Sequence, residues 1–497
     1  MNLRSALRTT TAAITAALTG GAAVALVILN PTVLPGQARS QEATQVDLSP
    51  SDYAAVCFTG PVVGSQSSGD SEFGQTSEAT HSITSLTQLP RLERDAAGPA
   101  PAPGTYMRGL SGQSFPLAPL GAGSALTVEN ESEPGLVSVP VNGPHRPLVA
   151  AGTVSINPKG DQRGLSAYTC QEPDAEAWLV GAASTVGTRS ELVISNPGKT
   201  AATVDIDVYT ERGKEADGPG QLSIAAGSSQ RIVLGGSVPD AERLAVHVQA
   251  EGGRVAPAII YSALDGITPQ GSGIVAAGSG PATEQFLTGV VLNETSAGSS
   301  VRLVNTGDDV GKATVTVWGK DGASALPGAE DLTLDPGAVQ DLTLDGIEPG
   351  AYSISVTSNS QVVVAAQVNR AGAQGARATT WIPASKATTA LAVPILSGHS
   401  LTSELVLAAP ADSEAQVLFA LADGSYAPAQ NVTVTGEQTV TVEVPAQARG
   451  VVVTASTPVF GGVVVSTDLG DGPAAAVLTG SADADQQRSV KVSIPHH

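Results

Sequence analysis

The sequence predicts an all-β protein built of tandem immunoglobulin-like β-sandwich modules that follow one N-terminal transmembrane or signal helix. Three observations lead to this prediction. Short segments alternate apolar and polar residues, which is the period of half-buried strands. The chain contains 55 Gly and 33 Pro, enough to supply many turns. The segments also recur about every hundred residues, which is the size of one sandwich.

The N-terminal segment is expected to direct the chain out of the cytoplasm. Arg4 and Arg8 precede the apolar stretch 11–29, which at a rise of about 1.5 Å per residue would just cross a hydrocarbon core of ~30 Å. This length favours a retained signal anchor with the body outside the cytoplasmic membrane. The small residues Gly36 and Ala38 allow the alternative, a cleaved signal peptide and a secreted body.

Composition narrows the classes of function. The 46 acidic residues outnumber the 25 Lys and Arg residues, which gives a net charge of −21. Such a chain repels phosphate backbones, so no nucleic-acid partner is expected. Aromatic residues make up only 3% of the chain, so Val, Ala, Leu and Ile must fill the cores. Two Cys in 497 residues suit an oxidising compartment.

Three copies of one strand pattern define the repeats. Asn196, Asn305 and Ala409 occupy equivalent positions, at intervals of 109 and 104 residues. A degenerate module lies upstream, because the strand around Ala151 aligns with later copies. The expected organisation is a stub, anchor helix and linker (1–42), a degenerate module (43–175), repeat 1 (176–282), repeat 2 (283–388) and repeat 3 (389–497).

The alternation is clearest in residues 202–209 of repeat 1. Val204, Ile206 and Val208 are expected to face the core, and the polar residues between them to face solvent. A β-helix or a propeller is the alternative architecture, but each is expected to show a period shorter than about 100 residues. The sandwich interpretation is therefore preferred.

The degenerate module is expected to contain a disulfide. Its middle is interrupted by the polar stretch 65–82 and the Ala/Pro/Gly run 96–104, which are too polar or too proline-rich to bury. Cys57 lies in its first strand and Cys170 in the strand that leads out. An oxidising compartment favours a Cys57–Cys170 bond over two free thiols.

No catalytic, metal-binding or cofactor-binding motif is found in the sequence. The six His residues lack metal-ligand spacing, and no nucleophile elbow, phosphate loop or dinucleotide fingerprint occurs. Four aromatic residues stand at matching places in the repeats: Tyr168, Trp178, Phe286 and Trp381. Their recurrence favours packing in or between modules, with ligand stacking as the alternative.

The segment from Glu176 to Gly198 carries the pattern Trp178-Leu-Val-Gly181 followed by Asn196-Pro-Gly198. It resembles an uncharacterised actinobacterial family of membrane-anchored or secreted cell-envelope proteins. The resemblance covers roughly residues 165–475, and it weakens in the later copies, where Phe286 or Leu391 replaces the tryptophan. Members are often encoded near envelope glycosyltransferases, which implies service to cell-wall or surface-glycan assembly. The resemblance assigns no catalytic residue.

The function expected from these observations is a non-catalytic, extracytoplasmic scaffold or accessory protein of the cell envelope. It would be tethered to the cytoplasmic membrane by its N-terminal helix and would contact an envelope protein or glycan. The alternative is a protein that binds or processes a cell-wall or surface glycan. Exposed tryptophans beside converging carboxylates would favour the alternative, and buried tryptophans would favour the scaffold.

Overall fold

Almost all regular structure in the computed structural model is β-strand, as the alternating sequence predicts. The model describes residues 44–47, 49–61, 81–90, 105–110, 125–129, 134–326, 328–398, 400–483 and 489–492. Helical geometry in these ranges is limited to α2 (Leu234–Ser237) and the 3-10 turn η1 (Ala373–Gly375). The expected anchor helix, its cleavage site and most of the two interrupting stretches lie outside the described residues.

The described residues fall into two units. In one, β1 (Thr44–Asp47) pairs antiparallel with β34 (Ser489–Val492). The other unit spans residues 50–487 and holds all the remaining strands. We divide this larger unit into four modules by its sheets.

The strands of the four modules have the following bounds. The first module contains β2 (Tyr53–Cys57), β3 (His81–Leu89), β4 (Tyr106–Gly109), β5 (Ala125–Glu129), β6 (Gly135–Val139), β7 (Leu148–Asn157) and β8 (Gly164–Thr169). The second contains β9 (Glu176–Val180), β10 (Thr188–Asn196), β11 (Ala202–Thr210), β12 (Gly213–Lys214), β13 (Gly220–Ile224), β14 (Ser228–Val233), β15 (Ala245–Glu251), β16 (Ala256–Asp265) and β17 (Thr268–Ala276).

The third and fourth modules follow the same plan. The third contains β18 (Ala282–Leu292), β19 (Ser300–Asn305), β20 (Gly311–Gly319), β21 (Gly322–Ala325), β22 (Leu332–Leu334), β23 (Val339–Thr343), β24 (Gly350–Ala371) and β25 (Arg377–Pro383). The fourth contains β26 (Thr388–Pro394), β27 (Thr402–Ala408), β28 (Ser413–Leu421), β29 (Gln430–Val434), β30 (Thr439–Glu443), β31 (Ala448–Asp468), β32 (Pro473–Thr479) and β33 (Ser481–Ala482).

Each module pairs its strands into two sheets in one recurring order. In the second module, β9, β15, β11 and β12 with β13 form the first sheet, and β14, β10, β16 and β17 form the second. In the third and fourth modules the single long strands β24 and β31 begin in the first sheet and continue into the second. The two sheets of a module share one apolar core.

The predicted alternation in the second module is confirmed. Val204, Ile206 and Val208 on β11 are buried, and the residues between them are half-buried. The second sheets behave differently, because nearly every residue on their central strands is buried. A sheet covered on both faces has a neighbour on its outer side as well as its own core.

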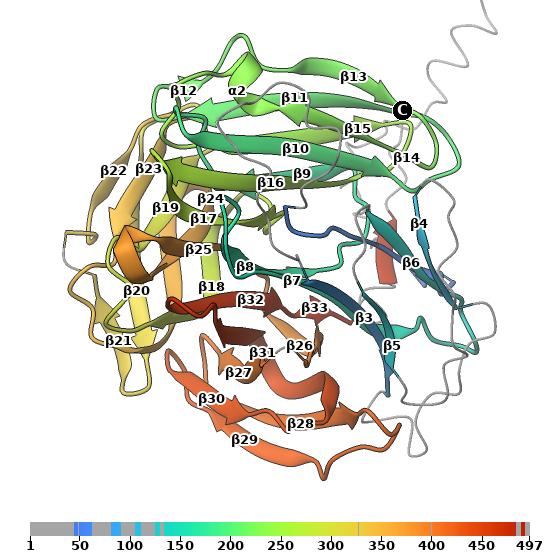
Figure 1. Cartoon of the computed structure of the whole chain (residues 1–497). Coiled ribbons are helices and arrows are strands. Elements are labelled where there is room, and N and C mark those ends of the chain that lie inside the picture. The colour runs from blue at the N-terminus through green and yellow to red at the C-terminus, as the bar shows by residue number, and fades with distance from the viewer. Residues whose placement is uncertain are drawn as a thin grey trace, which may run out of the picture. The chain divides into compact units, whose positions relative to one another are not determined.

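That neighbour is the adjacent module, and the four modules close into a propeller-like ring (Figure 1). The last strand of each module lies at the centre: β8 contacts β17, β17 contacts β25, β25 contacts β32, and β32 contacts β8. Each second sheet packs against the module before it, and the fourth module packs against the first. The apolar interfaces include Phe58 with Ile274, Leu179 with Val304, Leu287 with Val464, and Val452 with Leu148.

Ring closure was not predicted from the sequence. The hundred-residue period argued against a propeller of small blades, but here each blade is a two-sheet module of that length. The hundred-residue recurrence also predicts independently cored modules in tandem, whereas residues 50–487 form one unit with shared interfaces. The sequence pattern records the strands of each module and carries no signal for how the modules contact one another.

Polar contacts link the turns at one end of the ring axis. The hydroxyl of Ser272 donates to the carbonyl of Gln162, and the Gln270 side chain donates to the carbonyl of Gly375. The backbone N–H of Ala373 donates to the carbonyl of Asp471. The Asp471 carboxylate completes the circuit through an ion pair with the buried Arg163. Each pair of adjacent modules is therefore joined at this end.

A buried asparagine fixes the turn after the second strand in two modules. The side chain of Asn305 donates to the carbonyls of Asp309 and Leu334 and accepts from the N–H of Gly307. Asn196 makes the equivalent three bonds in the second module. The Asn-Pro-Gly and Asn-Thr-Gly segments are thus turn chemistry.

Candidate functional site

One cavity of the ring lies where the four inner strands end. Its volume is about 460 Å³. Its lining includes one four-residue segment from the end of each inner strand: Thr169–Glu172, Ala277–Gly280, Pro383–Lys386 and Thr479–Ala482. We call it the axial cavity. Every module contributes a wall, so the cavity exists only because the ring closes.

Hydrogen bonds between modules hold these segments in place. The Gln171 side chain donates to the carbonyl of Ala277 at 2.7 Å, and the N–H of Ser279 donates to the carbonyl of Ala384 at 2.9 Å. The hydroxyl of Thr169 donates to a carbonyl of the fourth module at 2.8 Å. The walls of the axial cavity are therefore fixed by the same contacts that join the modules.

Acidic side chains enter the axial cavity from one linker. Glu172 forms an ion pair with Arg146, and Asp174 lies 3.7 Å from the exposed Arg254. Lys386 contributes a positive charge from the linker after β25. The cavity can therefore contact a ligand or partner through charged groups and through the hydroxyl and backbone groups of its walls.

Trp178 lies in the wall of this cavity, but only 4% of its surface is exposed. Its ring stacks on His247 with the centroids 4.4 Å apart and contacts Tyr209 at 5.2 Å. The indole N–H donates to Glu176, whose carboxylate also lies 3.0 Å from the His247 Nε2. Trp178 therefore packs mainly against its own module.

The other predicted aromatic residues are also packed. Tyr168 is 1% exposed and meets Phe58 edge-to-face at 5.4 Å. Phe286 is partly buried and stacks on Phe460 of the next module at 4.2 Å. Trp381 is 6% exposed and lines a different cavity from Trp178. The structure does not bring the four aromatic residues together.

The predicted Cys57–Cys170 disulfide is confirmed. It joins the end of β2 to the residue after β8 and lies in the core of the first module. Cys170 and the neighbouring Tyr53 both line the axial cavity. Burial raises the pKa of the Tyr53 phenol, and the negative charge of Glu172 raises it further. Tyr53 thus stays neutral and serves the cavity as a packing group.

A second cavity, of about 320 Å³, lies between the second and third modules. We call it the inter-module cleft. It contains three arginines, Arg243, Arg302 and Arg377, with the carboxylates of Glu242 and Asp341. These residues were not predicted, because they come from separate strands and loops and form no motif in the sequence.

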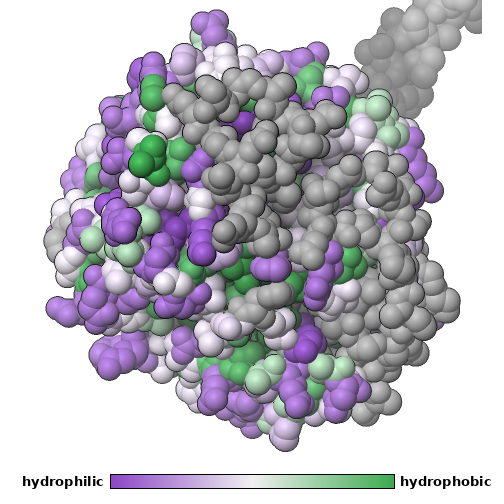
Figure 2. All heavy atoms as spheres, viewed as in Figure 1, coloured by the Kyte–Doolittle hydropathy of each residue, from purple (hydrophilic) through white to green (hydrophobic). Residues whose placement is uncertain are grey.

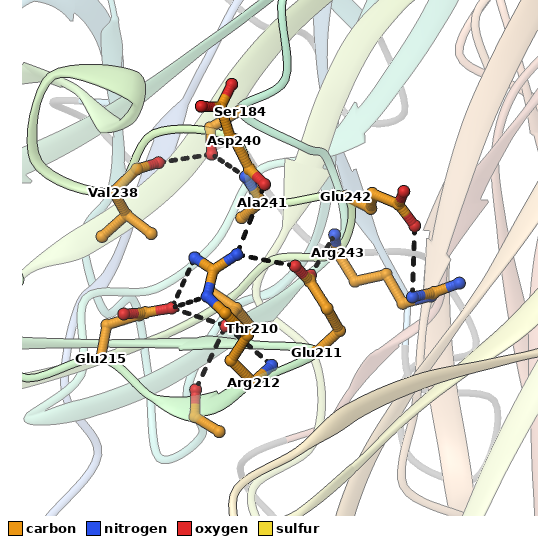
Figure 3. Close-up of polar contacts among 11 residues, drawn as sticks. Ser184, Thr210, Glu211, Arg212, Glu215, Val238, Asp240, Ala241, Glu242 and Arg243 are labelled. Carbon is orange, nitrogen blue, oxygen red and sulfur yellow. Dashed lines mark hydrogen bonds and ion pairs between the residues drawn. The ribbon is translucent and has the colours of Figure 1, made fainter.

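A polar network on the second module positions Arg243 (Figure 3). The Glu211 carboxylate accepts from the backbone N–H of Arg243 at 3.2 Å and pairs with Arg212 at 2.9 Å. Arg212 also pairs with Glu215. Figure 3 shows the Arg243 side chain directed away from these groups, toward Glu242.

The described ranges contain no cluster of three His, Cys, Asp or Glu residues that could hold a metal ion. A search of the same residues finds no helix with the length and apolarity needed to cross a bilayer.

Comparisons with known proteins give one match. Searches among curated proteins and among solved structures find nothing similar to the chain. A family model described as a family of unknown function, DUF5719, matches residues 125–445. The match begins in the first module and ends in the fourth, so it covers well over half of the chain and extends across three of the interfaces in the ring. The chain therefore belongs to the DUF5719 family.

Proposed function

We propose that this chain is a non-catalytic scaffold or accessory protein of the cell envelope, with its body outside the cytoplasmic membrane and its N-terminal segment as the tether. The observation that carries the proposal is the axial cavity, whose wall comes from all four modules. A partner bound there would contact the whole ring at once, as a docking platform requires.

The rigidity of the ring supports this role. Apolar interfaces join every adjacent pair of modules, and hydrogen bonds link the segments around the cavity. A preorganised surface loses less conformational freedom on binding than a flexible one, which favours a stable complex.

Two features support placement outside the cytoplasm. The disulfide between Cys57 and Cys170 suits an oxidising compartment. Arg4 and Arg8 before the uncharged stretch 11–29 suit an exported chain whose positive flank stays in the cytoplasm. Under this proposal the protein comes from an actinobacterium and is anchored in its cytoplasmic membrane.

We further infer that each module is an immunoglobulin-like sandwich with two strands exchanged between its sheets. In the second module β10 pairs with β14 and β11 pairs with β15, which matches the B–E and C–F pairs of that fold. The first strand, β9, however, pairs with β15, and β16 pairs with β10. This exchange gives the second sheet its additional inner strand.

A second candidate function is binding or processing of an envelope glycan. It is favoured by three carboxylates at the axial cavity near Trp178: Glu172 and Asp174 on the linker after β8, and Glu176 at the start of β9. The low exposure of Trp178 leaves little of its ring for a sugar to stack on, so the scaffold is the preferred function.

Photocrosslinking in the native envelope would test the proposal. A photoreactive amino acid at Lys386, on the exposed rim of the axial cavity, is expected to capture one envelope protein. The same substitution at the exposed Lys312 in the third module serves as the control. Capture of polysaccharide alone at position 386, or the same products at both positions, would refute the scaffold. Labelling from the cytoplasmic side only would refute the placement.

A further inference from the structure

We propose that the inter-module cleft binds a small, hydroxyl-bearing anion of the acidic-sugar class. The proposal concerns a different cavity from the axial one and stands whether or not the chain is a scaffold. It rests on the charge of the cleft, on Arg302 at a position where the second and fourth modules have valine, and on the guanidinium groups of Arg243 and Arg377, which make no hydrogen bond in the described part of the chain.

The charge of the cleft is opposite in sign to that of the chain. Three arginines against two carboxylates leave the lining with a net charge of +1, whereas the whole chain carries −21. A positive site within an acidic molecule attracts small anions selectively, because the surrounding surface repels them. Because large polyanions would also meet the acidic surface, a small ligand is favoured.

Arg302 occupies a position where the other repeats have an apolar residue. Its equivalents are Val193 in the second module and Val406 in the fourth, each packed against the preceding module. The cross-strand partner of Arg302 is Asp341, whereas Val406 faces Thr441. A buried ion pair is no more stabilising than well-packed apolar residues, so module packing alone does not explain Arg302.

Arg302 is held rigidly in the floor of the cleft. Its Nε and Nη2 donate to the two carboxylate oxygens of Asp341 at 2.7 and 2.9 Å. Its Nη1 donates to the carbonyl of Ala182 at 2.6 Å, and its guanidinium lies 4.6 Å from the centre of the Trp381 ring. Gly181 leaves room for this ring, since a Cβ there would lie 2.8 Å from it.

The other two arginines have guanidinium groups available for a ligand. Within the described part of the chain, no side-chain nitrogen of Arg243 makes a hydrogen bond. Its buried Nε forms an ion pair with Asp341 at 3.3 Å, but the two groups are not aligned for a hydrogen bond. Among the described residues, the one other ion pair of Arg243 is to the exposed Glu242 at 3.5 Å. Arg377 pairs with Ala371 through its backbone, but its exposed side chain makes no ion pair or hydrogen bond to the described residues. Two guanidinium groups in the lining of the cleft can therefore donate to an oxyanion that enters it.

Neutral polar groups complete the cleft. The amides of Gln270, Gln367 and Asn369 and the hydroxyls of Ser190 and Thr379 line it, as donors and acceptors suited to the hydroxyls of a sugar. The volume of about 320 Å³ lies at the small end of ligand pockets. A carboxylate or phosphate on a single sugar unit matches both the charge and the size.

Titration of the full-length protein in detergent would test the proposal. Glucuronate and glucose 6-phosphate supply the two forms of the anion, and glucose is the neutral control. We expect both charged sugars to bind more tightly than glucose and to weaken as salt rises. The sugar that binds more tightly shows whether the cleft prefers a carboxylate or a phosphate. Binding of neither, or equal binding of glucose, would overturn the proposal.

Variants separate binding from folding. Arg243→Gln and Arg377→Gln each remove one charged donor, and each should weaken binding about tenfold or more. Arg254→Gln makes the same charge change outside the cleft and should leave the affinity within about twofold. The pair R302V/D341T reproduces the Val406–Thr441 pair of the fourth module, so it should fold but lose binding. Unchanged affinity in this folded double variant would also overturn the proposal.

Discussion

The ion pair between Arg163 and Asp471 should hold the ring closed, because it joins the first module to the fourth across 308 residues. The Arg163 Nε lies 2.8 and 2.9 Å from the two carboxylate oxygens, and Nη2 lies 2.5 Å from one of them. The Arg163 side chain is 2% exposed and that of Asp471 is 38% exposed. Asp471→Asn would therefore leave a buried guanidinium without its counter-charge.

The expected loss follows from these exposures. Removing one partner of a fully buried pair costs about 3–5 kcal/mol. Because water reaches Asp471, the pair is only partly buried, and we expect Asp471→Asn to lower the free energy of unfolding by a smaller amount, about 2–3 kcal/mol. Lys312 and Asp331 form a matched exposed pair at 2.6 Å, so Asp331→Asn should cost no more than about 1 kcal/mol.

Urea unfolding of the full-length protein measures both losses. The double variant R163M/D471N removes the buried charge as well as its partner and should recover most of the stability lost in D471N. If D471N lowers the free energy of unfolding no more than D331N does, the pair does not hold the ring closed. The same conclusion follows if the double variant is less stable than D471N.

Three further predictions concern the cores of the modules. Replacing Cys57 and Cys170 by Ser should lower the free energy of unfolding by about 4–5 kcal/mol, since the bond closes a 113-residue loop; equal urea midpoints with and without reductant would contradict this. Asn305→Ala should cost about 2–3 kcal/mol because it leaves the buried carbonyl of Leu334 and the partly buried bond at Asp309 without a donor. Asn359→Ala at an exposed bond should cost less than about 1 kcal/mol, and comparable losses in the two variants would argue against the turn role. Burial raises the pKa of Tyr53, Tyr168 and Tyr261 above that of a free tyrosine and lowers the pKa of Arg370 to about 10. As pH rises above 10, these three tyrosines therefore lower the free energy of unfolding and Arg370 raises it. The four groups together should lower the free energy of unfolding by roughly 3 kcal/mol per pH unit. Urea midpoints at pH 9, 10 and 11 would check the sign.

The candidate sites show where prediction from the sequence ended. Cys57 and Cys170 could be paired because the chain has no other cysteine. Tyr168 and Trp178 were singled out because they recur at matching positions, and both prove to be buried. Arg302 could have been noticed as a charged residue at a position that valine occupies in the second and fourth modules. Its partners in the cleft come from strands and loops spread over more than a hundred residues, and only the ring brings them together.

The sequence by itself determined the β class, the repeating strand plan, the turns and the disulfide. These features depend on neighbouring residues, on the period-two pattern and on a single pair of thiols. The tertiary structure alone decided which strands lie at the centre, which strands pair within each module, and that the first module contacts the fourth. Those contacts depend on the complementary shapes of outer sheet faces that lie far apart in the chain, and alternation within a strand does not encode them.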